Sequence, residues 1–201
     1  MNSSNDQIWN VPNKLSAARL FLSFVVFALI PLGLYWAALV VFLIAAGTDW
    51  IDGWWARKYD QVTQLGRILD PFCDKILICG VFILLAVAMD PVDVFPWYAK
   101  VAGWMAVVVV GRELLVTVIR SLIEGSGGDF SAKMAGKLKM WFQCIAAGAA
   151  LVALAMNAAG NELPGWLLWT MVVSTWVAVG STLHSGYLYV VAAKDILIGN
   201  K

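Results

Sequence analysis

The sequence predicts an all-α fold in which several helices cross a membrane. Of the 201 residues, 61% are hydrophobic and 13% are charged, a composition too apolar for a soluble domain. Apolar stretches long enough to span ~30 Å of hydrocarbon at ~1.5 Å per residue recur along the chain, separated by short polar segments. The net charge of +1 creates no global field that would attract nucleic acid. We therefore expect a polytopic helical membrane protein with no nucleic-acid partner.

Six transmembrane helices account for the apolar stretches. A polar N-terminal segment at 1–14 precedes the first helix, for which Asn13 or Ser16 is a suitable N-cap and which ends near Pro31. The other five helices are expected at about 34–58, 67–89, 97–124, 131–157 and 164–194. No linker or change of composition divides them, so we expect residues 1–201 to form one domain.

Positive charge is divided unevenly between the two sides of the membrane. Lysine and arginine residues are expected on the side of the N-terminus, or deep in helices that open to it, and only Lys100 is expected on the other side. The positive-inside rule then places both termini in the cytoplasm. We expect the six helices to surround a polar cavity that opens to the cytoplasmic face of the inner (cytoplasmic) membrane.

Four aspartates cluster where the second and third expected helices meet: Asp49, Asp52, Asp70 and Asp74. Residues three or four positions apart share one face of a helix, ~5–6 Å apart, so the two pairs converge if these helices pack side by side. Four carboxylates cannot all remain ionised at close range without a cation. Ligands that are all oxygen favour Mg²⁺, Mn²⁺ or Ca²⁺. The sequence therefore predicts a site for one or two divalent cations.

Residues between the aspartates suit a substrate that carries phosphate. Gly53 and Gly66 lack side chains where backbone or substrate must approach closely, and Arg57 can bind phosphate through its guanidinium group. Metals, carboxylates and an arginine together indicate phosphoryl transfer. A divalent-cation transporter is the alternative of another class. Its polar residues should continue across the bilayer, whereas here they stop partway.

A second polar group is expected in the fourth and fifth helices. Arg112 and Arg120 are eight residues apart and project to nearly one face, and Lys137 opens the following helix. A guanidinium deep in a membrane should face a polar cavity or a carboxylate rather than lipid. We expect these three cations to bind the phosphate of an anionic acceptor. The alternative is an internal ion pair of Arg112 and Arg120 with Glu113.

Other polar side chains are interpreted as structural. His184 lies alone in an apolar helix and is expected to be an interior histidine with satisfied hydrogen bonds. Lys133 and Lys139 are interpreted as part of a basic patch at the membrane surface. The cysteines show no metal-binding spacing and are expected to be small core residues: Cys73, Cys79 and Cys144.

The spacing of the aspartate stretch also resembles a known family signature. All eight fixed positions match that of the CDP-alcohol phosphotransferases: Asp49-x2-Asp52-Gly53-x2-Ala56-Arg57-x8-Gly66-x3-Asp70-x3-Asp74. The resemblance implies that Asp49, Asp52 and Asp70 hold two ions of Mg²⁺ or Mn²⁺. It also implies that Asp74 adds a ligand and acts as general base. The residues that it assigns to binding CDP-diacylglycerol are Asp52, Gly53, Ala56, Arg57 and Gly66.

Within this family, three elements most resemble the branch of bacterial phosphatidylglycerophosphate synthases: Arg112-Glu113 with Arg120, Leu69-Asp70-Pro71-x2-Asp74-Lys75, and Gly136-Lys137-x-Lys139. That resemblance implies transfer of the phosphatidyl group from CDP-diacylglycerol to glycerol 3-phosphate, which gives phosphatidylglycerol phosphate and CMP. The same chemistry with phosphatidylglycerol, in cardiolipin synthesis, or with inositol phosphate remains open. Membrane lipids are expected partners. A homodimer is also expected, from the family resemblance and from small residues in the fifth helix that allow close helix approach: Ala146, Ala147 and Ala150.

Overall fold

The computed structural model describes residues 11–59, 64–125 and 134–197, and these ranges fold into six α-helices. The helices are α1 (Val11–Leu29), α2 (Tyr35–Tyr59), α3 (Gln64–Met89), α4 (Gly103–Gly125), α5 (Met134–Ala158) and α6 (Gly165–Leu197). Side chains are described for 14–48, 72–73, 75–121, 139–191 and 193–194. The all-α prediction is confirmed for the described part of the chain.

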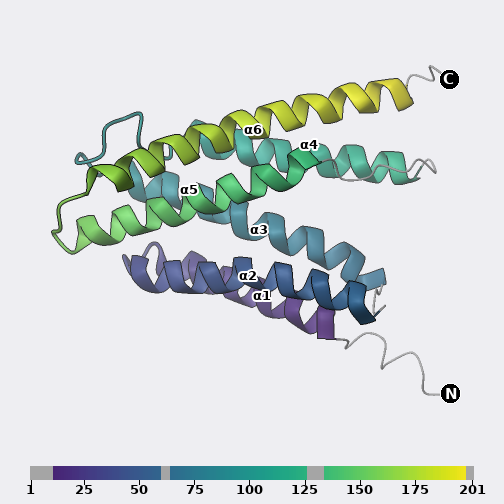
Figure 1. Cartoon of the computed structure of the whole chain (residues 1–201), viewed down its shortest axis with the longest axis horizontal. Helices are drawn as coiled ribbons and strands as arrows, with labels where there is room; N and C mark the ends of the chain where they lie inside the picture. The colour runs from purple at the N-terminus through teal and green to yellow at the C-terminus, as the bar shows by residue number, and fades with distance from the viewer. Residues whose placement is uncertain (1–10, 60–63, 126–133, 198–201) are drawn as a thin grey trace.

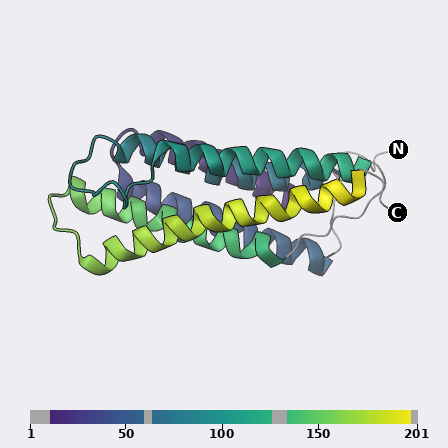
Figure 2. The same ribbon diagram turned by 90° about the horizontal axis from the view of Figure 1, so that it is seen from above.

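The helices run back and forth along one long axis (Figure 1). The start of α1 and the end of α6 lie at the same end of the molecule. The end of α2, the start of α3, the end of α4 and the start of α5 lie there too, and we call this the signature end. Figure 2, seen from above, shows that the helices lie along the same long axis in this view too. Both halves of the aspartate stretch therefore belong to one end of the bundle.

Glycines close two of the turns at the opposite end. Gly33 has a φ of 73° and Gly160 has a φ of 71°, a left-handed conformation that glycine adopts without the steric cost of a Cβ atom. After α1, the Leu34 amide donates to the Leu29 carbonyl at 3.1 Å and the Gly33 amide donates to the Ile30 carbonyl at 3.0 Å. This pair of bonds is a Schellman motif, and the end of α5 repeats it around Gly160. The two motifs let α2 and α6 fold back along α1 and α5.

Helix α5 lies centrally, against α6 and α2 and also against α3. Its close approach depends on three alanines that are all fully buried inside the chain: Ala146, Ala147 and Ala150. These small residues do not support the predicted homodimer interface, because they pack within one chain. The core around them is filled by larger apolar side chains from several helices, including Phe42, Phe82, Leu85, Leu151 and Leu154.

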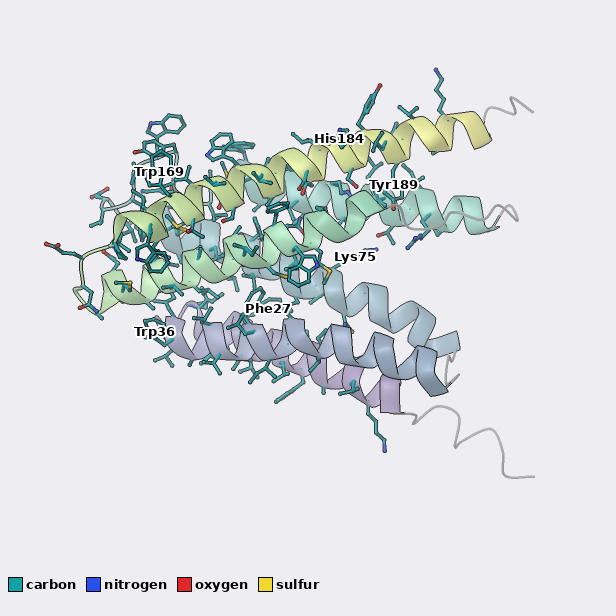
Figure 3. The ribbon with its side chains drawn as sticks, in the orientation of Figure 1. Phe27, Trp36, Lys75, Trp169, His184 and Tyr189 are labelled. Atoms are coloured by element: carbon teal, nitrogen blue, oxygen red, sulfur yellow. The ribbon has the colours of Figure 1, made fainter. Side chains whose placement is uncertain are left out.

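The described helices are consistent with a membrane protein. Two segments are long and apolar enough to cross a bilayer, Lys139–Ala158 and Gly165–Val191. Two exposed tryptophans, Trp36 and Trp169, lie at the end opposite the signature end (Figure 3). Tryptophan is enriched at membrane–water interfaces, because its ring is apolar and its N–H needs a polar partner.

Some local predictions are wrong. Helix α4 begins at Gly103 rather than near residue 97, because Pro96 and the residues after it form turns in which the Ala99 amide donates to the Pro96 carbonyl at 2.9 Å. Asn13 and Ser16 lie inside α1, so neither is its N-cap. His184 is exposed on α6 and is not an interior histidine. Of the cysteines, Cys73 is fully buried as expected, whereas Cys79 and Cys144 are half-buried.

Candidate functional site

The aspartates lie on two continuous helices at the signature end. Asp49 and Asp52 are in α2, which continues to Tyr59, and Asp70 and Asp74 are in α3, which begins at Gln64. Because α3 starts at Gln64 and not near residue 67, its aspartates lie in the second and third turns. Helical spacing within each pair is confirmed for the backbone. The side chains of all four lie outside the described residues, so convergence of the carboxylates stays a prediction.

The other predicted substrate-binding positions are also helical. They are Gly53, Ala56 and Arg57 in α2, Gly66 in α3, and Lys137 in the first turn of α5. The side chains of these residues lie outside the described set, as does Lys133 as a whole. The structure places all five residues near helix ends, at the signature end.

A buried arginine of α1 contacts α2 immediately before the first aspartate. Arg19 is 1% exposed, and its Nε donates to Thr48 Oγ1 at 3.4 Å. The Thr48 hydroxyl donates in turn to the Ala45 carbonyl at 2.7 Å. A buried guanidinium needs polar partners, so this contact favours one register of α1 against α2. The sequence analysis counted Arg19 only as a positive charge near the N-terminus and missed this internal position.

A lysine next to the last aspartate links α3 to α4. Lys75 Nζ donates to Thr117 Oγ1, and the Thr117 hydroxyl donates to the Glu113 carbonyl at 2.6 Å. Lys75 directly follows Asp74, and Glu113 directly follows Arg112. The aspartate-bearing helix is therefore held against the helix that carries the second polar group. In Figure 3, Lys75 and Tyr189 lie in the half of the bundle nearer the signature end.

Arg112, from the second polar group, lies in a buried cluster that joins α4, α5 and α6. Arg112 Nη1 donates to Glu113 Oε1 at 3.3 Å, Arg112 Nη2 donates to Ser185 Oγ, and the guanidinium lies 5.3 Å from the centre of the Tyr189 ring. Lys139 Nζ donates to the same Glu113 Oε1. We call these five residues the Arg112 cluster. It includes the ion pair between Arg112 and Glu113 that the sequence left as an alternative.

The position of Lys139 overturns its interpretation as a membrane-surface residue. Its side chain is 7% exposed, and it forms an ion pair with Glu113 across two helices. A charged amine is buried at this level only when a partner compensates the lost hydration. Arg120, two turns after Arg112 on α4, is half-buried. The structure thus places Arg112 in the cluster, and the convergence of Arg112, Arg120 and Lys137 stays a prediction.

Three members of the cluster were missed by sequence reasoning. Lys139, Ser185 and Tyr189 are separated from Arg112 by long stretches of chain, so only the fold brings them together. One local signal existed. Ser185 and Tyr189 are four residues apart and therefore share a face of α6. A polar residue and a tyrosine on one face of an apolar helix indicate a polar neighbour.

An open groove of about 700 Å³ lies between α3 and α4, away from the aspartates. Its lining is Ile83, Ala86, Val87, Asp90, Gly103, Ala106, Val107, Val110 and Gly111. Ile83 is nine residues beyond Asp74, or ~13 Å along the helix. The groove is apolar and belongs to the end opposite the signature end, so we do not assign the chemistry to it.

Known proteins match the chain along nearly its whole length. A family model described as CDP-alcohol phosphatidyltransferase matches residues 9–177. A Bacillus subtilis protein named CDP-diacylglycerol--glycerol-3-phosphate 3-phosphatidyltransferase is 34% identical over 90% of this chain and 94% of its own length. Proteins of the same name from Blochmanniella floridana and Rickettsia typhi are 29% and 30% identical, over 96% and 92% of this chain and 96% and 97% of their own lengths. The chain belongs to the CDP-alcohol phosphatidyltransferase family.

Proposed function

We propose that this protein transfers the phosphatidyl group of CDP-diacylglycerol to the hydroxyl of glycerol 3-phosphate, giving phosphatidylglycerol phosphate and CMP. The relatives named above carry a name for this reaction and match nearly the whole chain. The observation that carries the proposal is the complete eight-position signature on the adjoining ends of α2 and α3. The Arg112 cluster, on the helix that Lys75 links to α3, adds the positive charge that an anionic acceptor requires.

The donor set of the signature fits a divalent cation. Two pairs of carboxylates with helical spacing lie at the same end of the bundle, and Mg²⁺ and Mn²⁺ prefer oxygen ligands. We assign two ions of Mg²⁺ or Mn²⁺ to Asp49, Asp52, Asp70 and Asp74. Such ions, when bound, neutralise charge on the pyrophosphate and on the departing CMP. Purified protein should lose turnover in excess chelator and regain it when Mg²⁺ or Mn²⁺ is restored, and full turnover in chelator would rule the ions out.

Asp74 has the role of general base in this proposal. Its carboxylate takes the proton of the acceptor hydroxyl while the hydroxyl oxygen forms a bond to the phosphatidyl phosphorus. The bond from that phosphorus to the CMP oxygen breaks, and CMP leaves with the electron pair. The pocket for CDP-diacylglycerol is assigned to Asp52, Gly53, Ala56, Arg57 and Gly66. Arg57 is suited to a phosphate oxygen because its planar guanidinium offers two parallel donors.

The acceptor phosphate is assigned to Arg112, Arg120 and Lys137. Support comes from the position of Arg112, which is 9% exposed at the side chain and held by groups from two helices. Its Nε is buried and has no hydrogen-bond partner among the described residues. A charged donor buried in this way is costly to leave unmatched, and a phosphate oxygen would satisfy it.

The proposal includes the topology of the whole chain. We propose that residues 1–201 form one domain of six membrane spans around a polar cavity, in the inner membrane. Supporting this, the described helices alternate in direction and bring the start of α1 and the end of α6 to one end. The excess of lysine and arginine toward that end supports a cytoplasmic location for both termini and the active site.

An acceptor screen tests the reaction. Purified protein would be given CDP-diacylglycerol with a labelled phosphatidyl group and, in separate assays, glycerol 3-phosphate, phosphatidylglycerol or inositol phosphate. We expect labelled phosphatidylglycerol phosphate and an equal amount of CMP with glycerol 3-phosphate. Preferential labelling of cardiolipin or of an inositol lipid would show that glycerol 3-phosphate is not the preferred acceptor, while phosphatidyl transfer would stand. Absence of transfer to every acceptor, with Mg²⁺ and Mn²⁺ present, would overturn the proposal.

We also propose a homodimer, which now rests on the family resemblance alone. The alanines of α5 give it no support, because they are buried within the chain. Native mass measurement of active protein in detergent should give twice the mass of one chain. A single-chain mass for the active species would contradict the dimer.

A further inference from the structure

The carboxylate of Glu113 is shared by two cations from different helices. Its Oε1 accepts from Arg112 Nη1 at 3.3 Å and from Lys139 Nζ. The exposed fractions of these three side chains are 9% for Arg112, 9% for Glu113 and 7% for Lys139. Charges buried to this extent interact strongly, since water screens them poorly. The state of one ion pair therefore affects the other.

The cluster carries a surplus of one positive charge. Among the side chains that the structure describes, the other acidic ones are Asp90, Asp93 and Glu162, all exposed in the connections at the opposite end. Of the described acidic side chains, Glu113 alone therefore balances the charges of Arg112 and Lys139. A lone pair of Arg112 and Glu113 would be neutral and would offer an anion little attraction. With Lys139 present, the same site keeps one net positive charge.

The orientation of Arg112 leaves one of its donor groups unmatched by the described residues. Glu113 and Ser185 accept from its two terminal nitrogens, while Tyr189 lies against the guanidinium face. Nε is buried and without a hydrogen-bond partner among the described residues. Glu113 thus holds Arg112 in place. Lys139 offsets the negative charge of Glu113, which would otherwise cancel the positive charge of Arg112.

We propose that Lys139 determines the affinity for the anionic acceptor by neutralising Glu113, so that Arg112 keeps its positive charge for the acceptor phosphate. Lys139 is a positioning and charge-balancing residue in this scheme and touches no substrate. The inference rests on the proposed assignment of Arg112 to glycerol 3-phosphate. The inference adds that the affinity for the acceptor depends on the net charge of the Arg112 cluster. A purely structural ion pair would show no such dependence.

Removing one charge and then both gives the test. Lys139→Met leaves the cluster neutral, so we expect the KM for glycerol 3-phosphate to rise at least about tenfold while the KM for CDP-diacylglycerol stays within about twofold. Glu113→Gln combined with Lys139→Met returns the cluster to one positive charge. We expect this double variant to recover a KM for glycerol 3-phosphate within about threefold of the unaltered protein. Size-exclusion profiles and Tm in detergent report folding for each.

The outcomes separate this inference from the proposed function. If Arg112→Ala raises the acceptor KM but Lys139→Met leaves it unchanged, the charge inference fails and the acceptor site stands. If Arg112→Ala has no effect on the acceptor KM, the acceptor site itself fails. If Lys139→Met does not fold, the double variant alone decides whether the charge inference holds. The double variant is expected to fold, because replacing both members of a buried ion pair by neutral groups is tolerated better than removing one. A folded double variant with an acceptor KM raised tenfold overturns the inference.

Discussion

The two polar regions of this molecule are built in opposite ways. The signature region lies on adjoining ends of α2 and α3, and its residues are close in sequence. The Arg112 cluster joins three helices through pairs that are 26 and 73 residues apart. One region is rich in carboxylates and suits cations, and the other has a surplus of positive charge and suits an anion. The difference teaches that local helical spacing builds the first region, whereas packing between distant helices builds the second, with Lys75 of α3 bonded to Thr117 of α4 between them.

The largest effect is expected from the signature region. We expect Asp74→Asn to lower kcat by ~10²–10⁴-fold, because the amide cannot take the proton of the acceptor hydroxyl. Much of the binding of a CDP-lipid analogue should survive, since the other three aspartates and Arg57 remain. Steady-state turnover and analogue binding would be measured together. Asp90→Asn is the matched control, because Asp90 is exposed at the opposite end, and near-normal turnover in Asp74→Asn would remove Asp74 as the base.

The next largest effect is expected on the use of glycerol 3-phosphate and not on the binding of CDP-diacylglycerol. We expect Arg112→Ala or Arg120→Ala to lower kcat/KM for glycerol 3-phosphate by ~10–150-fold, the equivalent of ~1.5–3 kcal/mol for a hydrogen bond to a charged group. The KM for CDP-diacylglycerol should change much less. Kinetics with each substrate varied in turn would show this, with Lys100→Ala as a control on the other side of the molecule. Loss of CDP-diacylglycerol affinity with an unchanged acceptor KM would move these arginines to the nucleotide or to the fold.

The two regions also differ in how far the sequence could predict them. Helical spacing places Asp49 near Asp52 and Asp70 near Asp74 by local geometry, so the signature could be recognised before any fold was known. The same local reasoning identified Arg112 but misplaced Lys139 at the surface, because its partner Glu113 lies on another helix. His184 was misjudged for a related reason. An apolar helix with all sides alike does not show which face is turned outward.

Helix ends also differ in how well the sequence predicts them. The glycines at 33 and 160 end α1 and α5 by local backbone chemistry, and the sequence placed both ends within about two residues. The start of α4 was misplaced because its first turn depends on the connection from α3. There, Lys100 Nζ donates to the Asp90 carbonyl at 2.8 Å, a contact that apolar patterning does not reveal.

A smaller effect is expected where α6 supports Arg112. Ser185→Ala removes the acceptor of the Arg112 Nη2 hydrogen bond, and we expect the KM for glycerol 3-phosphate to rise by about tenfold, at the lower end of the range for a charged hydrogen bond. Glu113 and Tyr189 still hold the guanidinium, so the loss should be less than for Arg112→Ala. Ser181→Ala is the matched control, because the Ser181 hydroxyl donates to the Ala178 carbonyl of its own helix at 3.0 Å. Equal effects in both serine variants would show that the α6 hydroxyl contributes only to the fold.

The smallest effect should come from a glycine that touches the arginine stem. A Cβ atom at Gly186 would lie 3.2 Å from Arg112 Cγ, which is tighter than ordinary contact, whereas one at Gly180 would meet nothing within 4 Å. We expect Gly186→Ala to displace Arg112 slightly and to raise the KM for glycerol 3-phosphate by about two- to fivefold, since small misplacements of binding groups lower rates measurably. Alanine is favoured over glycine inside a helix by ~1 kcal/mol, so Gly180→Ala should raise Tm without changing that KM. The two variants together separate the position of Arg112 from the stability of α6. If Gly186→Ala raises Tm as much as Gly180→Ala and leaves the acceptor KM unchanged, the stem of Arg112 adjusts freely and its fixed orientation does not set acceptor affinity.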